Sequence, residues 1–354
     1  MQYDMHYYGT YAMAAAAGIP KVDAEVIATA AQYVDDQNIA KWVLTKSQEG
    51  VLGIATAHHP IDAGLRTFHR SPAANDTRLV WVPFHFMPGA EGNNFEEKLV
   101  CRKDSKVVNK MLDHYLTELV INVHRPHALH LIGIAAHVYA DTFSHCGFSG
   151  IRSSQNHIDN DSIQFDDSHS DEILGYIEEK KGAFFSRFTE AAGMGHGAVL
   201  THPDRPYLKW SFRREDGTKI HKNNPEAFMA ACKALYTRFR QFTRLYYGKE
   251  VPAVMEWDKL EPHVKAILEF EGEAEARVQC WMAAMENGSL SAIPTCRHYD
   301  SSEWLGAVEG FENSETADKF HESDPYKFYA AADYHRNYVL KRLLPSEDVG
   351  LLVA

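Results

Sequence analysis

Several familiar signals are absent from this chain of 354 residues. It has no run of about 20 apolar residues, which excludes an ordinary transmembrane helix. It also lacks a GxGxxG loop, a P-loop, an HExxH helix and a GxSxG turn. The sequence therefore gives no sign of a phosphate-cradling nucleotide loop, a zincin-type protease or a serine hydrolase with a nucleophile elbow.

Cysteine is scarce: the five residues are widely spaced and form no CxxC pair. This distribution is typical of reduced thiols rather than of a disulfide framework. The apolar run at residues 12–17 could pass for a signal-peptide core, but the residues before it include Asp4 and no lysine or arginine. Since a signal peptide carries basic residues at that flank, we expect a cytoplasmic protein without a cleavable signal.

Positive charge is also limited, because 36 Lys and Arg face 48 Asp and Glu, for a net charge of −12. A protein that binds nucleic acid along its backbone needs clustered basic residues, so bulk nucleic-acid binding is not expected. Cleavage of a phosphodiester at a metal site is still compatible with this charge, because bound cations reverse the local field. We expect a small phosphate-ester or phospholipid as the partner.

Histidine, in contrast, is abundant, with 20 residues. His137, Asp141 and His145 are spaced at i, i+4 and i+8 in an apolar segment, and His130 lies seven residues before His137. Four residues turn an α-helix by about 400°, so these side chains share one face. Imidazole and carboxylate are ligands that zinc and similar divalent ions select. The spacing predicts a metal site, with His130 in a supporting position.

A purely structural alternative is a network of polar core residues without metal. A single histidine on an apolar helix face is usually a core residue bonded to a carbonyl group. Buried ionised groups, however, are costly unless they are paired or bind a cation. Three or four histidines aligned with an aspartate therefore favour the metal site over the polar network.

The pattern along the chain predicts an all-α fold in a single domain, residues 1–354. Helices are expected at about 24–33, 106–123, 126–145, 224–247, 261–285 and 324–343, with Ser105, Pro126, Asn224–Pro225 and Asp324–Pro325 as start signals. Residues 79–87 could form a short strand. The polar segment 147–171 is expected to be a functional loop.

Other segments must supply the remaining ligands, because one helix cannot surround an ion. His6 lies among tyrosines, and the Asp35–Asp36 pair follows an apolar helix. His85 is flanked by phenylalanines that would exclude water. His196 stands between two glycines, where the backbone can approach a partner closely.

Weaker candidates are two further pairs, His202 with Asp204, and His157 with Asp161, which again have i, i+4 spacing. Each of these candidates also has a structural interpretation, as a surface, capping or core residue.

The segment His137-Val-Tyr-Ala-Asp-Thr-Phe-Ser-His145 resembles the zinc-dependent phospholipase C superfamily, and its His-x3-Asp-x3-His is similar to the motif of the glycosylphosphatidylinositol-specific phospholipase D branch. The superfamily also contains the S1/P1 nucleases, which are mainly helical and hold three clustered zinc ions. The opening segment, the helix motif and Gly-His-Gly also resemble an uncharacterised bacterial branch. The resemblance implies ligands at His6, Asp35 or Asp36, His85, His137, Asp141 and His145, with His157 and Asp161 matching the spacing of a third site.

We therefore expect a metal-dependent hydrolase of phosphate esters, similar to a phospholipase C, with two or three zinc or similar ions. The expected ligands are His6, Asp36, His85, His137, Asp141, His145 and His196, and Asp35 and Asp141 are the expected catalytic carboxylates. Two alternatives stay open. One is a helical binding protein that metal only stabilises, and the other is the metal-free polar core.

Overall fold

A computed structural model describes residues 1–38, 42–57, 77–119, 121, 125–185, 195–196, 199–316, 318–347 and 349–350. Most of these residues form α-helices: α1 (Thr10–Ala16), α2 (Lys21–Asp36), α4 (Phe95–Lys98), α5 (Lys106–His114), α7 (Ala128–Ser144), α8 (Asp171–Phe185), α9 (Asn224–Tyr246), α10 (Trp257–Leu268), α11 (Ala274–Glu286), α12 (Ser302–Glu312), α13 (Asp324–Tyr338) and α14 (Leu344–Ser346). Four π-helical segments extend or connect them: η1 (Asp4–Gly9), η2 (Thr77–His85), η3 (Tyr115–Leu119) and η10 (Val339–Leu343).

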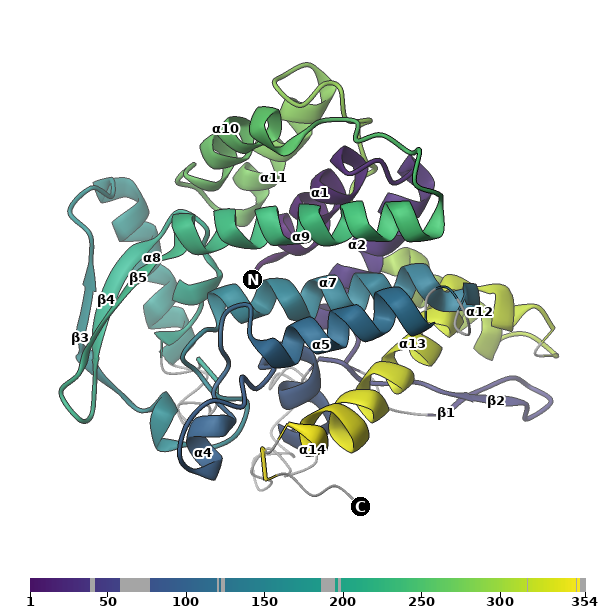
Figure 1. The fold of residues 1–354 in the computed structure, drawn as a ribbon, viewed down its shortest axis with the longest axis horizontal. Helices are drawn as coiled ribbons and strands as arrows, with labels where there is room; N and C mark the ends of the chain where they lie inside the picture. The colour runs from purple at the N-terminus through teal and green to yellow at the C-terminus, as the bar shows by residue number, and fades with distance from the viewer. Residues whose placement is uncertain are drawn as a thin grey trace.

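The histidine helix α7 lies at the centre of the molecule, with α2, α9 and α13 packed around it (Figure 1). Its sequence is mostly apolar, and all of its residues except Leu129 are buried, as expected for a helix surrounded by others. Gly133 allows the close approach of α2, because a Cβ atom here would lie 2.4 Å from the carbonyl oxygen of Ile27. The metal-type side chains of α7 are therefore held in the most enclosed part of the fold.

Three predicted helix starts agree with the structure, whereas α7 begins two residues after the predicted Pro126, and α2 begins at Lys21 rather than at residue 24. Ser105 caps α5 by accepting a hydrogen bond from the amide of Val108, and Ser323 caps α13 in the same way. The Asn223 side chain caps α9, with Pro225 in the first turn, where its missing N–H costs no hydrogen bond. These caps satisfy amide groups that the helices leave free at their N-termini.

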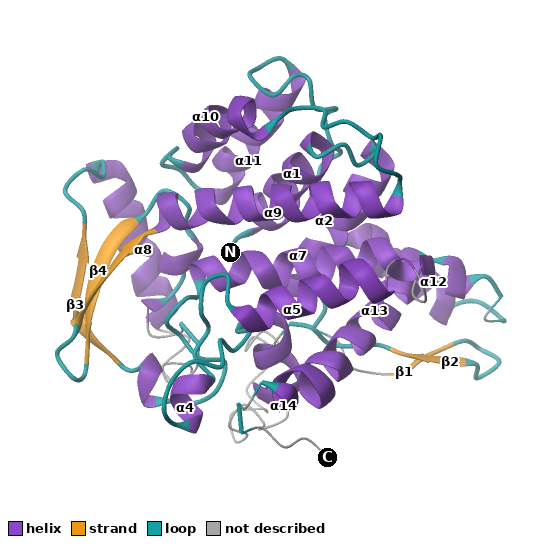
Figure 2. Ribbon diagram, in the orientation of Figure 1, coloured by secondary structure: helices purple, strands orange, loops and turns teal. Residues whose placement is uncertain are grey.

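The all-α prediction is wrong, because about 10% of the structure is in strands beside 58% in helices. A two-stranded hairpin, β1 (Trp42–Leu44) and β2 (Gly50–Leu52), lies at one end of the molecule. A three-stranded antiparallel sheet of β3 (Ile158–Phe165), β4 (Lys209–Arg214) and β5 (Lys219–Asn223) lies at the other end (Figure 2). Alternation explains β4, since its Trp210 and Phe212 face a second hydrophobic cluster with Phe86 and Phe148.

Three boundary predictions also need correction. Residues 79–85, most of the expected strand, belong to the π-helix η2 (Thr77–His85), because tertiary contacts override the β-propensity of this apolar segment. The expected helix 261–285 is two helices, α10 and α11, separated around Gly272. Segment 147–171 is only partly a loop, because it contains the whole of β3. Residues 120 and 122–124 of the expected helix 106–123 lie outside the described residues.

No described helix is long and apolar enough to cross a membrane.

Candidate metal centre

The carboxylate of Asp141 is the centre of the candidate site. It projects from the last turn of α7 and is 1% exposed. Its Oδ2 lies 3.2 Å from His137 Nε2 and 3.5 Å from His85 Nδ1, and these two nitrogens are 3.3 Å apart. Ligand atoms in a tetrahedral zinc site are about 3.3–3.5 Å apart, given metal–ligand distances of about 2.0–2.1 Å. The three atoms therefore have the spacing of one face of such a tetrahedron.

Asp35 lies beside this face and is the most accessible member of the group. It is the penultimate residue of α2, and its side chain is 32% exposed. Its Oδ1 is 3.7 Å from His85 Nδ1 and 3.8 Å from His137 Nε2. The carboxylate of Asp35 thus lies beside two of these ligand nitrogens and is partly open to solvent.

Backbone carbonyl groups fix the orientation of four imidazoles around the centre. The Nδ1–H groups of His137, His145 and His196 donate to the carbonyls of Ala31, His85 and Leu200, at 2.8, 2.9 and 2.7 Å. His85 donates instead through Nε2, to the carbonyl of Thr56 at 2.8 Å. A carbonyl accepts only, so each of these nitrogens carries the proton. In the neutral rings, the other nitrogen presents its lone pair to the cluster.

His6 forms a second part of the centre with Asp35 and Asp141. It lies in η1, is completely buried, and stacks on His137 with ring centroids 3.8 Å apart. Its Nε2 is 3.2 Å from Asp141 Oδ1 and 3.9 Å from Asp35 Oδ2. Neither ring nitrogen of His6 has a hydrogen-bond partner, and the same holds for Asp141 Oδ2. Such orphaned buried atoms need an explanation, and a bound cation is one.

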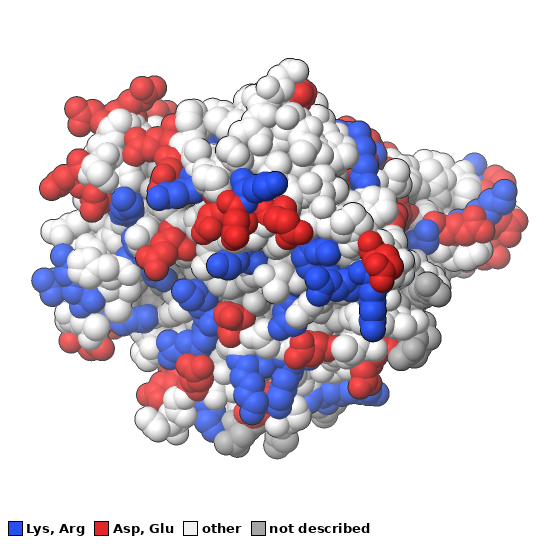
Figure 3. All heavy atoms as spheres, turned by 45° about the horizontal axis from the view of Figure 1, so that its top comes forward, with Lys and Arg blue, Asp and Glu red and all other residues white. Residues whose placement is uncertain are grey.

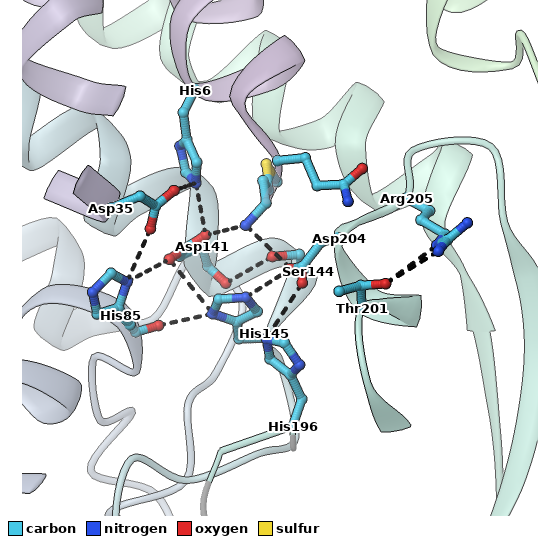
Figure 4. A network of polar contacts seen from close by, with 12 residues as sticks. His6, Asp35, His85, Asp141, Ser144, His145, His196, Thr201, Asp204 and Arg205 are labelled. Carbon is cyan, nitrogen blue, oxygen red and sulfur yellow. Dashed lines mark hydrogen bonds and ion pairs between the residues drawn. The ribbon is translucent and has the colours of Figure 1, made fainter. Parts of the chain in front are cut away.

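A third group brings His145 and His196 to Asp204 (Figure 4). His145 Nε2 is 3.0 Å from Asp204 Oδ1, and His196 Nε2 is 3.5 Å from Asp204 Oδ2. The approach of His196 depends on Gly195, which has a φ of 54° and whose added Cβ would lie 2.6 Å from the Phe86 ring. The close backbone approach predicted from the glycine beside His196 is therefore present, with Phe86 as the neighbour.

The α-amino group of Met1 joins the first and third groups. It lies 2.7 Å from Asp141 Oδ1 and 3.2 Å from Asp204 Oδ1. Burial lowers the pKa of this amine, but Asp141 and Asp204 outweigh it and raise the pKa to about 11. No residue pattern could have predicted this contact, because an α-amino group has no side-chain signature.

The protonation states of four members of the cluster suit a cation. Burial alone would raise the pKa of Asp141 and of Asp204, but nearby histidines and the Met1 ammonium hold both pKa values below the usual range. Burial lowers the pKa of His6 and of His196 to about 4. Near neutral pH, both carboxylates are therefore ionised and these two imidazoles are neutral, which are the forms that bind metal.

The donor set fits zinc or a similar divalent ion on two observations. Imidazole nitrogens and carboxylate oxygens converge in three groups: His85–His137–Asp141, His6–Asp35–His137 and His145–His196–Asp204. The imidazole protons point outward to carbonyls, which is the usual support for metal-binding histidines. His137 offers only Nε2, since its Nδ1 is occupied, so it serves one of the first two groups.

Several predicted residues lie outside the cluster. Asp36 belongs to none of the three groups and accepts a hydrogen bond from the Tyr299 hydroxyl, so Asp35 takes the place expected for Asp36. His130 contacts Asp324 at 3.1 Å rather than supporting a ligand.

The pair suggested for a third site is also elsewhere: the exposed His157 contacts Glu215, and Asp161 lies in strand β3. Asp204, a weaker candidate, is in the cluster, whereas its neighbour His202 packs beside Phe165 and Trp210.

Comparison with known proteins gives a family but no activity. Neither the curated proteins nor the solved structures contain a significant match to this chain. A family model, in contrast, matches residues 1–343, which include every residue of the candidate metal centre. The chain therefore belongs to a family of unknown function (DUF6765).

Proposed function

We propose that this protein is a metal-dependent hydrolase of phosphate esters, similar to a phospholipase C, with two or three zinc or similar ions held by the cluster around Asp141. The observation that carries the proposal is the convergence of imidazole lone pairs on buried carboxylates at 3.0–3.5 Å. Without a cation or protonation of the rings, this arrangement is repulsive, because both partners are electron-rich.

Clustered divalent cations, when bound, lower the pKa of a water molecule and offset the negative charge that develops on a phosphate ester during hydrolysis. His85, His137 and Asp141 are nearly or fully buried and would hold such ions. Asp35 has the partly exposed carboxylate of the cluster, so its oxygens would orient the attacking water and accept its proton. Substrate would therefore approach from the Asp35 side.

The surface charge agrees with a small substrate. Acidic and basic side chains are interspersed across the face in Figure 3, without a continuous basic surface for a nucleic-acid backbone. Phospholipid head groups and other phosphate esters both suit a site of this chemistry. Assays with phosphodiesters and with phospholipids distinguish the two substrate classes.

Two other functions have a specific observation in their favour. The deep burial of His137 and Asp141 suits ions that only stabilise the fold, in a binding protein without catalytic activity. The Met1 ammonium between Asp141 and Asp204 suits a metal-free polar network, because it already compensates part of the carboxylate charge. The three functions differ in metal content and in turnover.

The first experiment is elemental mass spectrometry of protein purified without a histidine tag or added metal, followed by assays with phosphodiesters and phospholipids. We expect two or three equivalents of zinc, manganese or iron, and hydrolysis that a chelator removes. Bound metal without turnover would favour the binding protein. A protein that is empty and takes up no zinc on titration would favour the polar network.

A matched pair of variants makes this test specific. His130 and His137 lie on the same helix, both buried, but only His137 is in the cluster. We expect His137→Gln to lose metal and activity while His130→Gln retains both, because glutamine can still donate to Asp324. Equal losses in both variants would point to a general effect on α7 and against the proposal.

A further inference from the structure

A buried ion pair outside the metal cluster holds the segment that carries His6. Arg277 in α11 contacts Asp4 through two donors, with Nε 2.7 Å from Oδ2 and Nη2 3.0 Å from Oδ1. The side chains of Arg277 and Asp4 are only 2% and 1% exposed. Within the described ranges, no other Arg or Lys forms an ion pair in which both side chains are so deeply buried.

The same guanidinium also binds Gln2 and the loop before α11. Its Nη2 donates to Gln2 Oε1, and its Nη1 donates to the carbonyl of Gly272 at 2.6 Å. All three nitrogens of Arg277 are thus in use, in a fork geometry that a lysine cannot reproduce. Arg277 joins residues 2 and 4 to a helix that is more than 270 positions away in the sequence.

A short path of contacts leads from Arg277 to the metal cluster. The carbonyl of Gln2, whose side chain Arg277 binds, accepts hydrogen bonds from the amides of Met5 and His6 at 3.0 and 3.1 Å. Asp4 precedes His6 by two residues in η1, which packs against α11. The His6 ring stacks on His137 but has no hydrogen-bond partner, so its position depends on its backbone, and Arg277 holds that backbone on both sides of Tyr3.

Stability alone is a weak reason for a buried ion pair. Removing two charges from water costs several kcal/mol per ion, and apolar residues of similar volume often replace such a pair without loss of stability. A pair of this kind can instead specify one arrangement of the chain. The element specified here is the one that carries His6 into the centre.

We infer that Arg277 is a positioning residue for the metal centre, which acts through Asp4 and Gln2 to hold His6 against Asp141. The inference rests on the proposed function, because His6 matters here as a metal ligand. It assigns a role in the centre to a residue that contacts none of the ligands.

The test is a double variant, Arg277→Met with Asp4→Leu, which removes both charges and leaves an apolar pair. The single variant Arg277→Met is less informative, because it leaves Asp4 as an unpaired buried charge and can unfold the protein. Folding is checked by circular dichroism. Hydrogen exchange of the peptide that covers residues 1–9 then measures the order of the segment, and cobalt(II) titration with visible absorption measures the metal centre.

The matched control is the exposed ion pair between Arg238 in α9 and Asp113 in α5, whose atoms are 2.7 Å apart. It joins two helices but lies at the surface, where Asp113 is 63% exposed. We expect Arg238→Met with Asp113→Leu to leave both the exchange of residues 1–9 and the cobalt spectrum as in the wild type.

For the Arg277–Asp4 double variant, we expect retained folding, faster exchange in residues 1–9 and the loss of about one cobalt equivalent, as in His6→Ala. Adding His6→Ala to the double variant should then cause no further loss. An unchanged cobalt spectrum would overturn the inference, whether or not the exchange increases. A wild-type protein that takes up no cobalt would overturn the proposed function itself, and the inference with it, before any variant is compared.

Discussion

The carbonyl oxygen of Ala31 in α2 accepts a hydrogen bond of 2.8 Å from His137 Nδ1 in α7. This bond fixes the tautomer of His137 and turns Nε2 toward Asp141. The contact is possible because the two helices approach closely at Gly133, one turn before His137. The packing of α2 against α7 therefore also sets the orientation of the His137 ring.

Gly133→Ala should disturb both the packing of α2 against α7 and the orientation of His137. The added methyl would lie 2.4 Å from the Ile27 carbonyl oxygen and 2.6 Å from Ala30 Cβ, so α2 must shift and take Ala31 with it. We expect a loss of about 1–3 kcal/mol in the free energy of unfolding, as for other overpacked cores, and weaker metal binding. Urea unfolding and zinc titration measure the two effects.

The control for this substitution is Gly175→Ala in α8, where an added Cβ meets nothing within 4 Å. Because alanine is the better helix former, this variant should be neutral or more stable by about 0.5–1 kcal/mol. Metal binding unchanged in Gly133→Ala would contradict the role of the Ala31 carbonyl.

Asp35→Asn and Asp36→Asn should differ sharply although they change neighbouring residues. Asp35 is within 4 Å of His6, His85 and His137, whereas Asp36 is held by the Tyr299 hydroxyl, which can bind an amide oxygen equally well. We expect Asp35→Asn to reduce phosphodiester hydrolysis about 100-fold, the usual range for loss of a proton-transfer group. Asp36→Asn should stay within a few-fold of the wild type. Steady-state kinetics with the two variants side by side decide the assignment, and the reverse order would refute it.

Gly195→Ala should impair the third group of ligands. Gly195 has a φ of 54°, which disfavours alanine, and the new Cβ would lie 2.6 Å from the Phe86 ring. We expect His196 to move away from Asp204 and at least one ion to bind more weakly in a zinc competition assay. Gly217→Ala is the control, because Gly217 also has a positive φ, of 82°, but open space around it. Similar metal affinity in both variants would show that strain alone, and not the position of His196, explains any effect.

The metal-free protein should lose stability as the pH falls below about 6.5. Burial lowers the pKa of His335 to about 4, as it does for His6 and His196. An unfolded histidine binds its proton near pH 6.5, so between that value and about pH 4 the unfolded state binds more protons. Each such group then removes about 1.4 kcal/mol per pH unit from the free energy of unfolding. Urea unfolding of chelator-treated protein at about pH 7.5 and about pH 5 measures this slope.

His335 allows its contribution to this slope to be separated from that of the cluster histidines, because it lies outside the cluster and contacts Tyr115 and Pro83. His335→Asn should reduce the pH dependence of the free energy of unfolding by the contribution of one buried imidazole. His321→Asn, at an exposed position, should leave it unchanged. A stability that is the same at both pH values in the wild type would contradict the buried neutral histidines.

The spacing in α7 predicted the part of the site that local geometry controls. His137, Asp141 and His145 share one helix face, and the structure keeps all three side chains within one cluster. The choice between Asp35 and Asp36 could not be made from sequence, because α2 is buried on most of its surface and its pattern does not show which side meets α7. The contact between Ala31 and His137 decides it, since Asp35 lies one turn after Ala31.

The pair His157 and Asp161 shows how a spacing rule fails with the wrong secondary structure. Four residues in a strand span about 13 Å, too far for one ion, whereas in a helix they are adjacent. The sheet itself had a signal, since Asp216–Gly217 between two alternating segments is a strong hairpin indicator. Asp204 could be placed only by the fold, because its ligand partners His145 and His196 come from separate segments.

The side chains of the cluster come from five separate stretches of chain, around residues 6, 35, 85, 137–145 and 196–204. Ions bound there would act as cross-links that close loops of some 30 to 60 residues each, in the way that disulfide bonds brace secreted proteins. This chain, whose cysteines are free, would then be stabilised by metal–ligand bonds that a chelator can remove. The metal supply of the cell would set how long the folded chain survives proteolysis, as well as whether it has any activity.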